Sequence, residues 1–186
     1  MSPRPLTSAR KGAPKGSAKS VVIFVHGYGA NGADLLGLAD PLAPHMRDTA
    51  FYAPDAPENC QGNPMGFQWF PIPWLDGSSE EAALSGQAQA AEDLNAFIDA
   101  VLADEGIPSS ALALVGFSQG TMMSLHIAPR RAEPIAVLVG FSGRLLQPET
   151  LAAETKSKPP ILLIHGDADP MVPVASLPEA ADALVK

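Results

Sequence analysis

Apolar positions along the chain fall into two alternating patterns. Short, continuously apolar runs that end at Gly, Pro or Asp are typical of strands buried on both faces of a parallel sheet. Five such runs occur, at residues 20–26, 50–53, 112–117, 135–141 and 161–165. Helical patterns separate several of them. The sequence therefore predicts an α/β fold with an open, mostly parallel sheet and helices on both faces.

The longest helical pattern lies between the second and third apolar runs. Its apolar residues recur at intervals of three and four, at Leu84, Ala88, Ala91, Leu94, Ile98 and Val101. Ser78 and Glu81 have capping-box spacing at its start, and Gly106 is a typical stop. Further helices are predicted over 119–127 and from Ser176 onward.

Charge divides the chain into two segments. Residues 1–19 carry five of the twelve basic residues and no acid, among Ser, Pro and Gly, which predicts a mobile basic tail. The remaining residues, 20–186, read as one domain with seven basic and 20 acidic residues. A body with this negative excess repels nucleic acid and anionic lipid, so neither is expected as a partner.

Cysteine usage and apolar run length indicate the compartment. Cys60 is the single cysteine, so no intramolecular disulfide can form, and no apolar run approaches the roughly 20 residues that span a bilayer. The first twenty residues lack the apolar segment of a secretory signal. We therefore expect a cytoplasmic protein without stable membrane insertion, while a homodimer stays open.

Two glycine-rich turns offer competing functions, and the first covers residues 27–32. It matches the G-x-G-x-x-G dinucleotide fingerprint after a strand, and Asp55 lies about twenty residues further on, where a ribose ligand belongs. The same turn begins His26-Gly27, however, which is also how esterases build an oxyanion hole. Asp55 lies between prolines and is expected to cap the loop rather than to bind ribose.

The second turn is Gly116-Phe117-Ser118-Gln119-Gly120, which follows a strand and precedes a helical pattern. This context is the one that the G-x-S-x-G nucleophile elbow of the α/β-hydrolase fold requires. Glycine is needed on either side because side chains there would collide in the sharp turn. Ser118 is the predicted nucleophile, and the backbone N–H groups of Tyr28 and Gln119 are the predicted oxyanion donors.

A third turn, at residues 165–173, supplies the candidate triad acid. In hydrolases of this fold the acid follows a later strand, and the chain order is Ser, then Asp or Glu, then His. Asp169 lies 51 residues after Ser118 and is the predicted acid. Asp167 is expected to hydrogen-bond the turn instead.

At this point the chain resembles the phospholipase/carboxylesterase family of serine esterases, which includes bacterial carboxylesterases and acyl-protein thioesterases. The resemblance rests on segments 26–39, 68–70, 116–120, 141–143 and 165–173. Residue by residue, it implies Ser118 as nucleophile, Asp169 as acid and the N–H groups of Tyr28 and Gln119 as oxyanion donors. It also implies that Trp69 and Phe70 flank the acyl site, although packing in a satellite core stays open for both.

The general base is the departure from this pattern. The triad histidine should follow Asp169 by roughly thirty residues, which lies beyond Lys186. None of His26, His45, His126 and His165 is expected to replace it. We therefore expect that the last strand and helix of the fold are missing, that the final visible strand has an exposed edge, and that these residues alone have doubtful activity. A relative that has lost catalysis is the alternative.

The sequence thus predicts a serine carboxylesterase that hydrolyses small acyl esters through an acyl-enzyme on Ser118. An acyl-protein thioesterase or lysophospholipase would use the same machinery. A dinucleotide-binding protein and a non-catalytic acyl-binding module are the alternatives from other classes. No cofactor is expected, and no metal, because no two histidines have ligand spacing with an acid between them.

Overall fold

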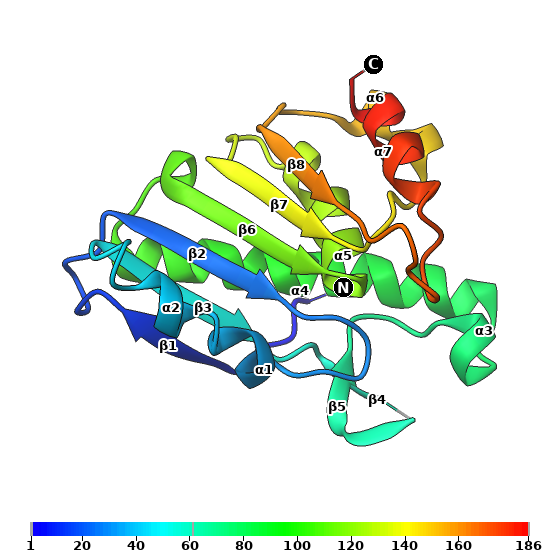
Figure 1. Cartoon of the computed structure of the whole chain (residues 1–186), viewed down its shortest axis with the longest axis horizontal. Helices are drawn as coiled ribbons and strands as arrows, with labels where there is room; N and C mark the ends of the chain where they lie inside the picture. The colour runs from blue at the N-terminus through cyan, green and yellow to red at the C-terminus, as the bar shows by residue number, and fades with distance from the viewer. Residues whose placement is uncertain (1, 61, 186) are drawn as a thin grey trace.

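The computed structural model describes residues 2–60 and 62–185. A six-stranded sheet crosses the molecule in the order β1-β3-β2-β6-β7-β8 (Figure 1). Its strands are β1 (Ser8–Gly12), β2 (Ser20–Val25), β3 (Thr49–Pro54), β6 (Leu112–Phe117), β7 (Val137–Phe141) and β8 (Ile161–Ile164). All neighbours pair in parallel except β1, which runs antiparallel to β3. A hairpin of β4 (Glu58–Cys60) and β5 (Asn63–Gln68) forms a separate two-stranded sheet.

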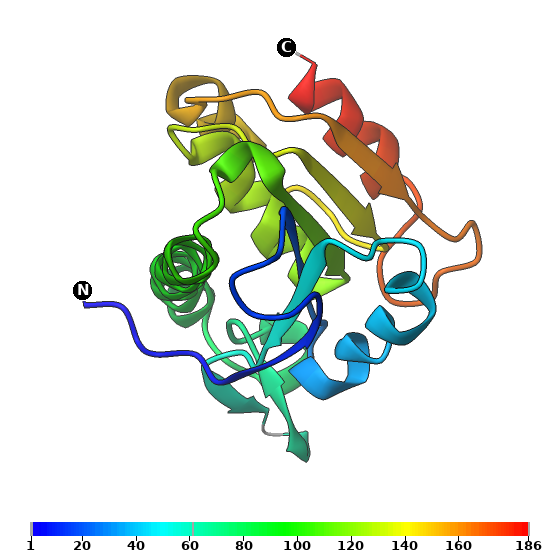
Figure 2. The same cartoon turned by 90° about the vertical axis from the view of Figure 1, so that its left-hand side faces the viewer.

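Helices cover both faces of the large sheet (Figure 2). One face carries α1 (Gly32–Leu36) and α2 (Ala39–Leu42), and the other carries α4 (Glu80–Glu105), α5 (Gln119–Ile127) and α6 (Pro148–Glu154). The short α3 (Pro73–Asp76) lies beyond the carboxyl ends of the strands, and α7 (Ser176–Leu184) contacts α6 and β8. Single 3₁₀ turns occur at Ser109–Ala111 and Ala128–Arg130. This architecture is the predicted α/β-hydrolase fold.

The central strands are apolar throughout because both of their faces are buried. Along β2, Val21, Ile23 and Val25 join the larger core beneath α4 and α5, whereas Val22 and Phe24 join a smaller core beneath α1. This alternation follows from the two-residue period of a strand. The continuous apolar run therefore identified a doubly covered strand, as predicted.

The predicted mobile tail is wrong for the residues that form β1. Residues 8–12 pair with β3 over their whole length, and Arg10 forms an ion pair with the buried Glu105 on α4 at 2.6 Å. Arg4 likewise pairs with the fully buried Asp93 on α4. The basic residues at these positions compensate buried acids on α4, which composition alone could not reveal.

Several boundaries also differ from the sequence pattern. The N-cap of α4 is Ser79, whose hydroxyl accepts the N–H of Ala82 at 3.1 Å, rather than Ser78. Ser176 is the first residue of α7 and makes no capping bond, since Ala175 occupies the cap. The β4–β5 hairpin and α6 were not predicted, because short elements of mixed polarity leave little periodicity to detect.

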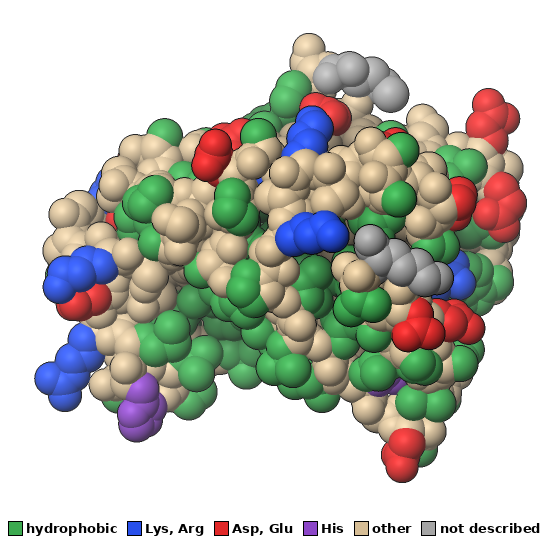
Figure 3. All heavy atoms as spheres, turned by 90° about the horizontal axis from the view of Figure 1, so that it is seen from above, with side chains coloured by type: hydrophobic (Ala, Val, Ile, Leu, Met, Phe, Trp, Pro, Cys, Tyr) green, Lys and Arg blue, Asp and Glu red, His purple; other side chains and the backbone are tan. Residues whose placement is uncertain are grey.

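The β8 end of the sheet differs from the β1 end. Within the described residues β8 is the edge strand, and Leu162 and Ile164 are exposed by 53% and 42%. Figure 3 views the molecule from this end and shows apolar side chains gathered across the middle of the face. The exposed edge agrees with the sequence expectation. Among the described helices, none is long and apolar enough to cross a membrane.

Candidate active site

The elbow at Ser118 joins β6 to α5 at the carboxyl edge of the sheet. Ser118 has φ 51° and ψ −114°, a conformation that L residues rarely adopt. Its N–H donates to the carbonyl of Phe141 on β7 at 2.9 Å, and the Thr121 hydroxyl donates to the same carbonyl at 2.8 Å. Strain at one residue is therefore held in place by bonds to the neighbouring strand.

The two glycines of the elbow are required by close packing. A Cβ at Gly116 would lie 2.6 Å from the Cα of Thr121, and a Cβ at Gly120 would collide with the carbonyl of Val25 on β2. Glycine at both positions lets α5 start directly against the sheet. The sequence prediction for these residues is confirmed.

Two backbone N–H groups, one at the elbow and one in the turn after β2, have no hydrogen-bond partner among the described residues. Gln119 is the first residue of α5, so its N–H has no partner within the helix. Within the described part of the chain, neither this N–H nor that of Tyr28 donates a hydrogen bond. The next residue, Gly29, instead donates to the carbonyl of Phe67 at 2.8 Å and fixes the Tyr28 turn.

The side chain of Gln119 fastens the elbow to the loop after β5. It is fully buried, its Oε1 accepts the N–H of Trp69 at 2.9 Å, and its Nε2 donates to the carbonyl of Phe70 at 2.8 Å. Trp69 is itself fully buried, and its indole N–H donates to the carbonyl of His26. Trp69 thus packs in the core, which is the alternative that the sequence left open for it. Phe70 lines a small cavity next to the elbow.

In the first glycine turn, the residues that a dinucleotide would require cap and pack helix α1 instead. Asp55 accepts the N–H of Gly32 at 2.8 Å, so this carboxylate caps α1, as the flanking prolines predicted. Asn31 and Asp34 complete a capping box at the same helix end. A Cβ at Gly32 would collide with the carbonyl of Ala53. The glycine spacing therefore serves helix packing.

Asp169 lies in the turn after β8 and organises that turn itself. Its Oδ1 accepts the N–H groups of Met171 and Val172 at 2.9 and 3.0 Å. These two bonds lower the pKa of the Asp169 carboxyl below its usual value, Val172 contributing more. The turn-bonding role expected of Asp167 thus belongs to Asp169, because its carboxylate, two positions later, reaches the following N–H groups.

The four histidines lie in four different environments. His26 is fully buried and its Nε2 accepts the N–H of Ala56, while His45 is exposed. The Nδ1 of His126 lies 3.2 Å from the Gln87 amide, and burial lowers its pKa to about 4. His165 donates Nε2–H to the carbonyl of Val172 at 2.9 Å. In the described residues, no histidine is hydrogen-bonded to Ser118.

Ser118 and Asp169 line one cavity of about 650 Å³, together with Tyr28, whose N–H is free. The other walls are largely apolar, from Ile72, Trp74, Leu75, Phe117, Met122 and Met171 among others. Burial raises the pKa of the Tyr28 phenol, so the phenol stays protonated. Among the described residues, no cluster of three or more His, Cys, Asp and Glu could hold a metal ion. The cavity is therefore lined by the candidate nucleophile, by Tyr28 and by mostly apolar side chains.

The sequence profile described as Phospholipase/Carboxylesterase matches residues 8–186. The chain belongs to this family. Its members are carboxylic ester hydrolases, and this chain therefore belongs to that class of enzyme. The match begins at the first residue of β1, which agrees with the place of that strand in the sheet.

Individual relatives of this family support the assignment. Esterase YpfH of Escherichia coli (strain K12) is 32% identical over 178 residues, covering 92% of this chain and 71% of the relative. The crystal structure of esterase PE8 superposes with a TM-score of 0.91 at 42% identity, covering 98% and 84% of the two chains. Zea mays acyl-protein thioesterase 2 superposes with a TM-score of 0.72 at 26% identity, covering 96% and 84%.

Sequence reasoning missed several residues of the cavity. Ser142 has φ 49° and lines it, and Gly143 follows because a Cβ there would collide with Thr121. Trp74 and Leu75 reach the cavity from α3, a four-residue helix that gives no periodic signal. The Phe141-Ser142-Gly143 match to the family could have found Ser142; nothing in the local sequence marks Trp74.

Proposed function

We propose that the protein is a serine carboxylesterase that hydrolyses small, neutral acyl esters through an acyl-enzyme on Ser118. The observation that carries this proposal is the strained elbow: Ser118 lines an apolar cavity together with Tyr28, and among the described residues the N–H groups of Tyr28 and of the adjacent Gln119 have no hydrogen-bond partner. Such donors stabilise the oxyanion of acyl transfer, each by roughly 3 kcal/mol. The family and the esterase relatives support the same reaction class.

The reaction proceeds in two balanced halves. The Ser118 Oγ attacks the ester carbonyl carbon, a base accepts the hydroxyl proton, and the same proton is returned to the departing alcohol. Water then attacks the acyl carbonyl carbon, the base accepts a proton from the water and returns it to the Ser118 Oγ as the acyl–oxygen bond breaks, and the carboxylic acid is released. The N–H groups of Tyr28 and Gln119 hold the oxyanion in both halves, and Asp169 orients the imidazole that acts as base.

The acidic body and the apolar cavity favour neutral acyl esters over polyanionic substrates. Thioesters and lysophospholipids are a second candidate class, because the same nucleophile and donors would act on their carbonyls. The specific observation in favour is the structural relationship to the acyl-protein thioesterase of Zea mays.

External imidazole tests the proposal directly on residues 1–186. Because none of the four histidines is bonded to Ser118, we expect turnover on the order of 10⁶ below that of an intact triad. Imidazole that enters the 650 Å³ cavity should raise the hydrolysis of p-nitrophenyl butyrate. Butyryl-thiocholine tested in parallel separates ester from thioester preference.

Ser118→Ala gives the background, since imidazole alone also cleaves activated esters. The matched control is Ser124→Ala. The Ser124 hydroxyl is buried and donates to the carbonyl of Gly120 inside α5, so it does not line the cavity at Ser118. The restored rate should disappear in Ser118→Ala and persist in Ser124→Ala. An imidazole-dependent rate that is equal in the Ser118 variant and the parent would refute the proposal.

A further inference from the structure

Trp74 separates the cavity at Ser118 from a second apolar cavity. Ile72, Trp74 and Met122 line both the 650 Å³ cavity and a smaller one of about 90 Å³. The smaller cavity lies between the loop that precedes α3 and the first turns of α4. Because the two cavities share these three side chains as walls, they are direct neighbours.

The walls of the second cavity are mostly apolar. They include Phe70, Pro71, Leu84 and Leu146, together with the polar side chains of Glu80, Gln87 and Arg144. A Cβ at Gly86 on α4 would lie only 2.8 Å from the Cδ of Pro71, so α4 packs tightly against the loop. A cavity with this lining suits hydrocarbon rather than a polar group.

The side chain of Trp74 can change its rotamer while the backbone of α3 stays fixed. Asp76 fixes both sides of α3, since its Oδ2 accepts the N–H of Ile72 at 2.8 Å and its Oδ1 accepts the N–H of Ser78 at 2.9 Å. The Trp74 side chain, in contrast, is 61% exposed. A rotamer change of an exposed side chain takes nanoseconds, so the ring can open faster than a typical enzyme turns over.

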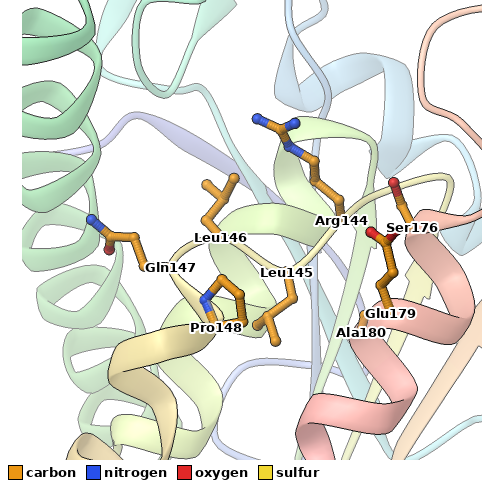
Figure 4. A pocket seen from close by; sticks show the side chains of 8 residues that line it. All are labelled: Arg144, Leu145, Leu146, Gln147, Pro148, Ser176, Glu179 and Ala180. Carbon is orange, nitrogen blue, oxygen red and sulfur yellow. The ribbon is translucent and has the colours of Figure 1, made fainter.

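Arg144 holds the ring in its present position. Its guanidinium carbon lies 5.3 Å from the centre of the Trp74 ring, within the range of a cation–π interaction. Figure 4 shows Arg144 above a polar cavity, with Leu146 on one side and Ser176 and Glu179 of α7 on the other. In this view the guanidinium points away from Ser176 and Glu179 of α7. An exposed contact of this kind favours the closed ring about two- to fivefold.

We propose that Trp74, held by Arg144, limits the length of the acyl chain by closing the second cavity. This inference rests on the proposed function, in which the acyl group of the ester occupies the cavity at Ser118. The occupant of the second cavity is then the distal end of a longer, unbranched acyl chain, because the cavity shares three walls with the first one and its lining is mostly apolar. Trp74 and Arg144 determine specificity and take no part in bond cleavage.

Binding of methyl ketones tests this without requiring catalysis. The readout is the dissociation constant of 2-hexanone divided by that of 2-dodecanone. Trp74→Ala should raise this ratio on the order of tenfold, because each further buried methylene strengthens binding about fourfold. Arg144→Met leaves the Trp74 ring in place but removes the cation–π interaction that holds it, and should raise the ratio two- to fivefold. The ratio of kcat/KM for p-nitrophenyl decanoate over butyrate should follow the same order.

Refilling the second cavity provides the control. Ala83 lines that cavity, whereas its neighbour Ala82 is exposed and does not. In the Trp74→Ala background, Ala83→Leu should return the ratio to the parent value and Ala82→Leu should leave it raised. An unchanged ratio in both Trp74→Ala and Arg144→Met, or a gain that survives Ala83→Leu, overturns the inference. The proposed function fails separately, if hydrolysis survives Ser118→Ala.

Discussion

The two turns that bear the candidate catalytic side chains are built in opposite ways. The elbow at Ser118 is enclosed: residues 119–125 of α5 are all buried, and the turn is bonded to β7 and to the loop after β5. The turn at residues 165–173 is mostly exposed and is held chiefly by Asp169 and His165. A nucleophile on a strained residue needs surroundings that determine its conformation, whereas a carboxylate can shape its own turn.

The largest effect should come from removing the charge of the acid turn. Asp169→Asn is expected to lower the serine-dependent, imidazole-restored rate by up to about 10⁴-fold, as when a triad aspartate becomes an amide. Asp167→Asn is the matched control, and its effect should be at least tenfold smaller. Initial rates with p-nitrophenyl butyrate give both values. Equal losses of rate in the two variants would contradict the assignment of Asp169 as the acid that orients the base.

The next effect contrasts the packing of the two turns. Gly120→Ala should destabilise the fold by about 3 kcal/mol, because the new Cβ meets the carbonyl of Val25 on β2. Gly166→Ala adds the same methyl group where no atom lies within 4 Å, and should stay within about 0.5 kcal/mol. Thermal unfolding should show a drop of roughly 6–12 °C for the first variant alone. Similar drops for both would contradict the contrast.

A smaller loss is expected when the elbow is detached from the loop after β5. Gln119→Ala leaves the N–H of Trp69 and the carbonyl of Phe70 buried without partners, which should cost about 2 kcal/mol. Gln89→Ala removes an amide at a half-buried position of α4, where Arg4 remains paired with Asp93, and should cost less than about 1 kcal/mol. Urea unfolding measures both. A smaller loss of stability for Gln119→Ala than for Gln89→Ala would mean that the two hydrogen bonds of the Gln119 side chain do not stabilise the fold.

The smallest effect is a pH dependence of stability that arises at α5. Burial, with repulsion from Arg130, lowers the pKa of His126 from 6.5 to about 4, while Glu154 opposes the shift and Gln87 contacts the neutral ring. The unfolded chain therefore binds a proton that the folded chain refuses. Stability should be complete above pH 6.5 and decline as the pH falls toward 4. His126→Gln should flatten this slope in urea unfolding at pH 7, 6 and 5, and His45→Gln, at an exposed site, should retain it.

The elbow could be predicted from the sequence because its requirements are local. Gly116 and Gly120 are needed wherever a strand turns sharply into a helix, and the apolar run before them identifies the strand. The acid turn was predicted only in part: Asp169 follows its strand as expected, but the hydrogen bonds that hold the turn were expected from Asp167, whereas Asp169 accepts the N–H groups of Met171 and Val172. Which carboxylate reaches which N–H depends on the path of the turn.

Residues distant in the chain were the least predictable. The sequence left open whether Trp69 flanks the acyl site or packs in the core, and only the structure shows that its N–H groups are bonded to Gln119 and His26, 50 and 43 residues away. Likewise, Arg4 and Arg10 seemed to belong to a mobile tail, while their partners lie on α4. A buried acid attracts a cation from anywhere in the chain, so no local pattern reveals the pair.

The sequence by itself determined the order of the five parallel strands and of α4, α5 and α7, the elbow at Ser118 and the family, since periodicity and turn sterics act within a few residues. The tertiary structure decided which side chains share a cavity. Trp74, Met122 and Asp169 come from three separate segments and meet only because parallel strands bring their carboxyl ends to one edge of the sheet. Local sequence fixes the turn that carries the serine; long-range packing fixes the size and lining of the cavity it faces.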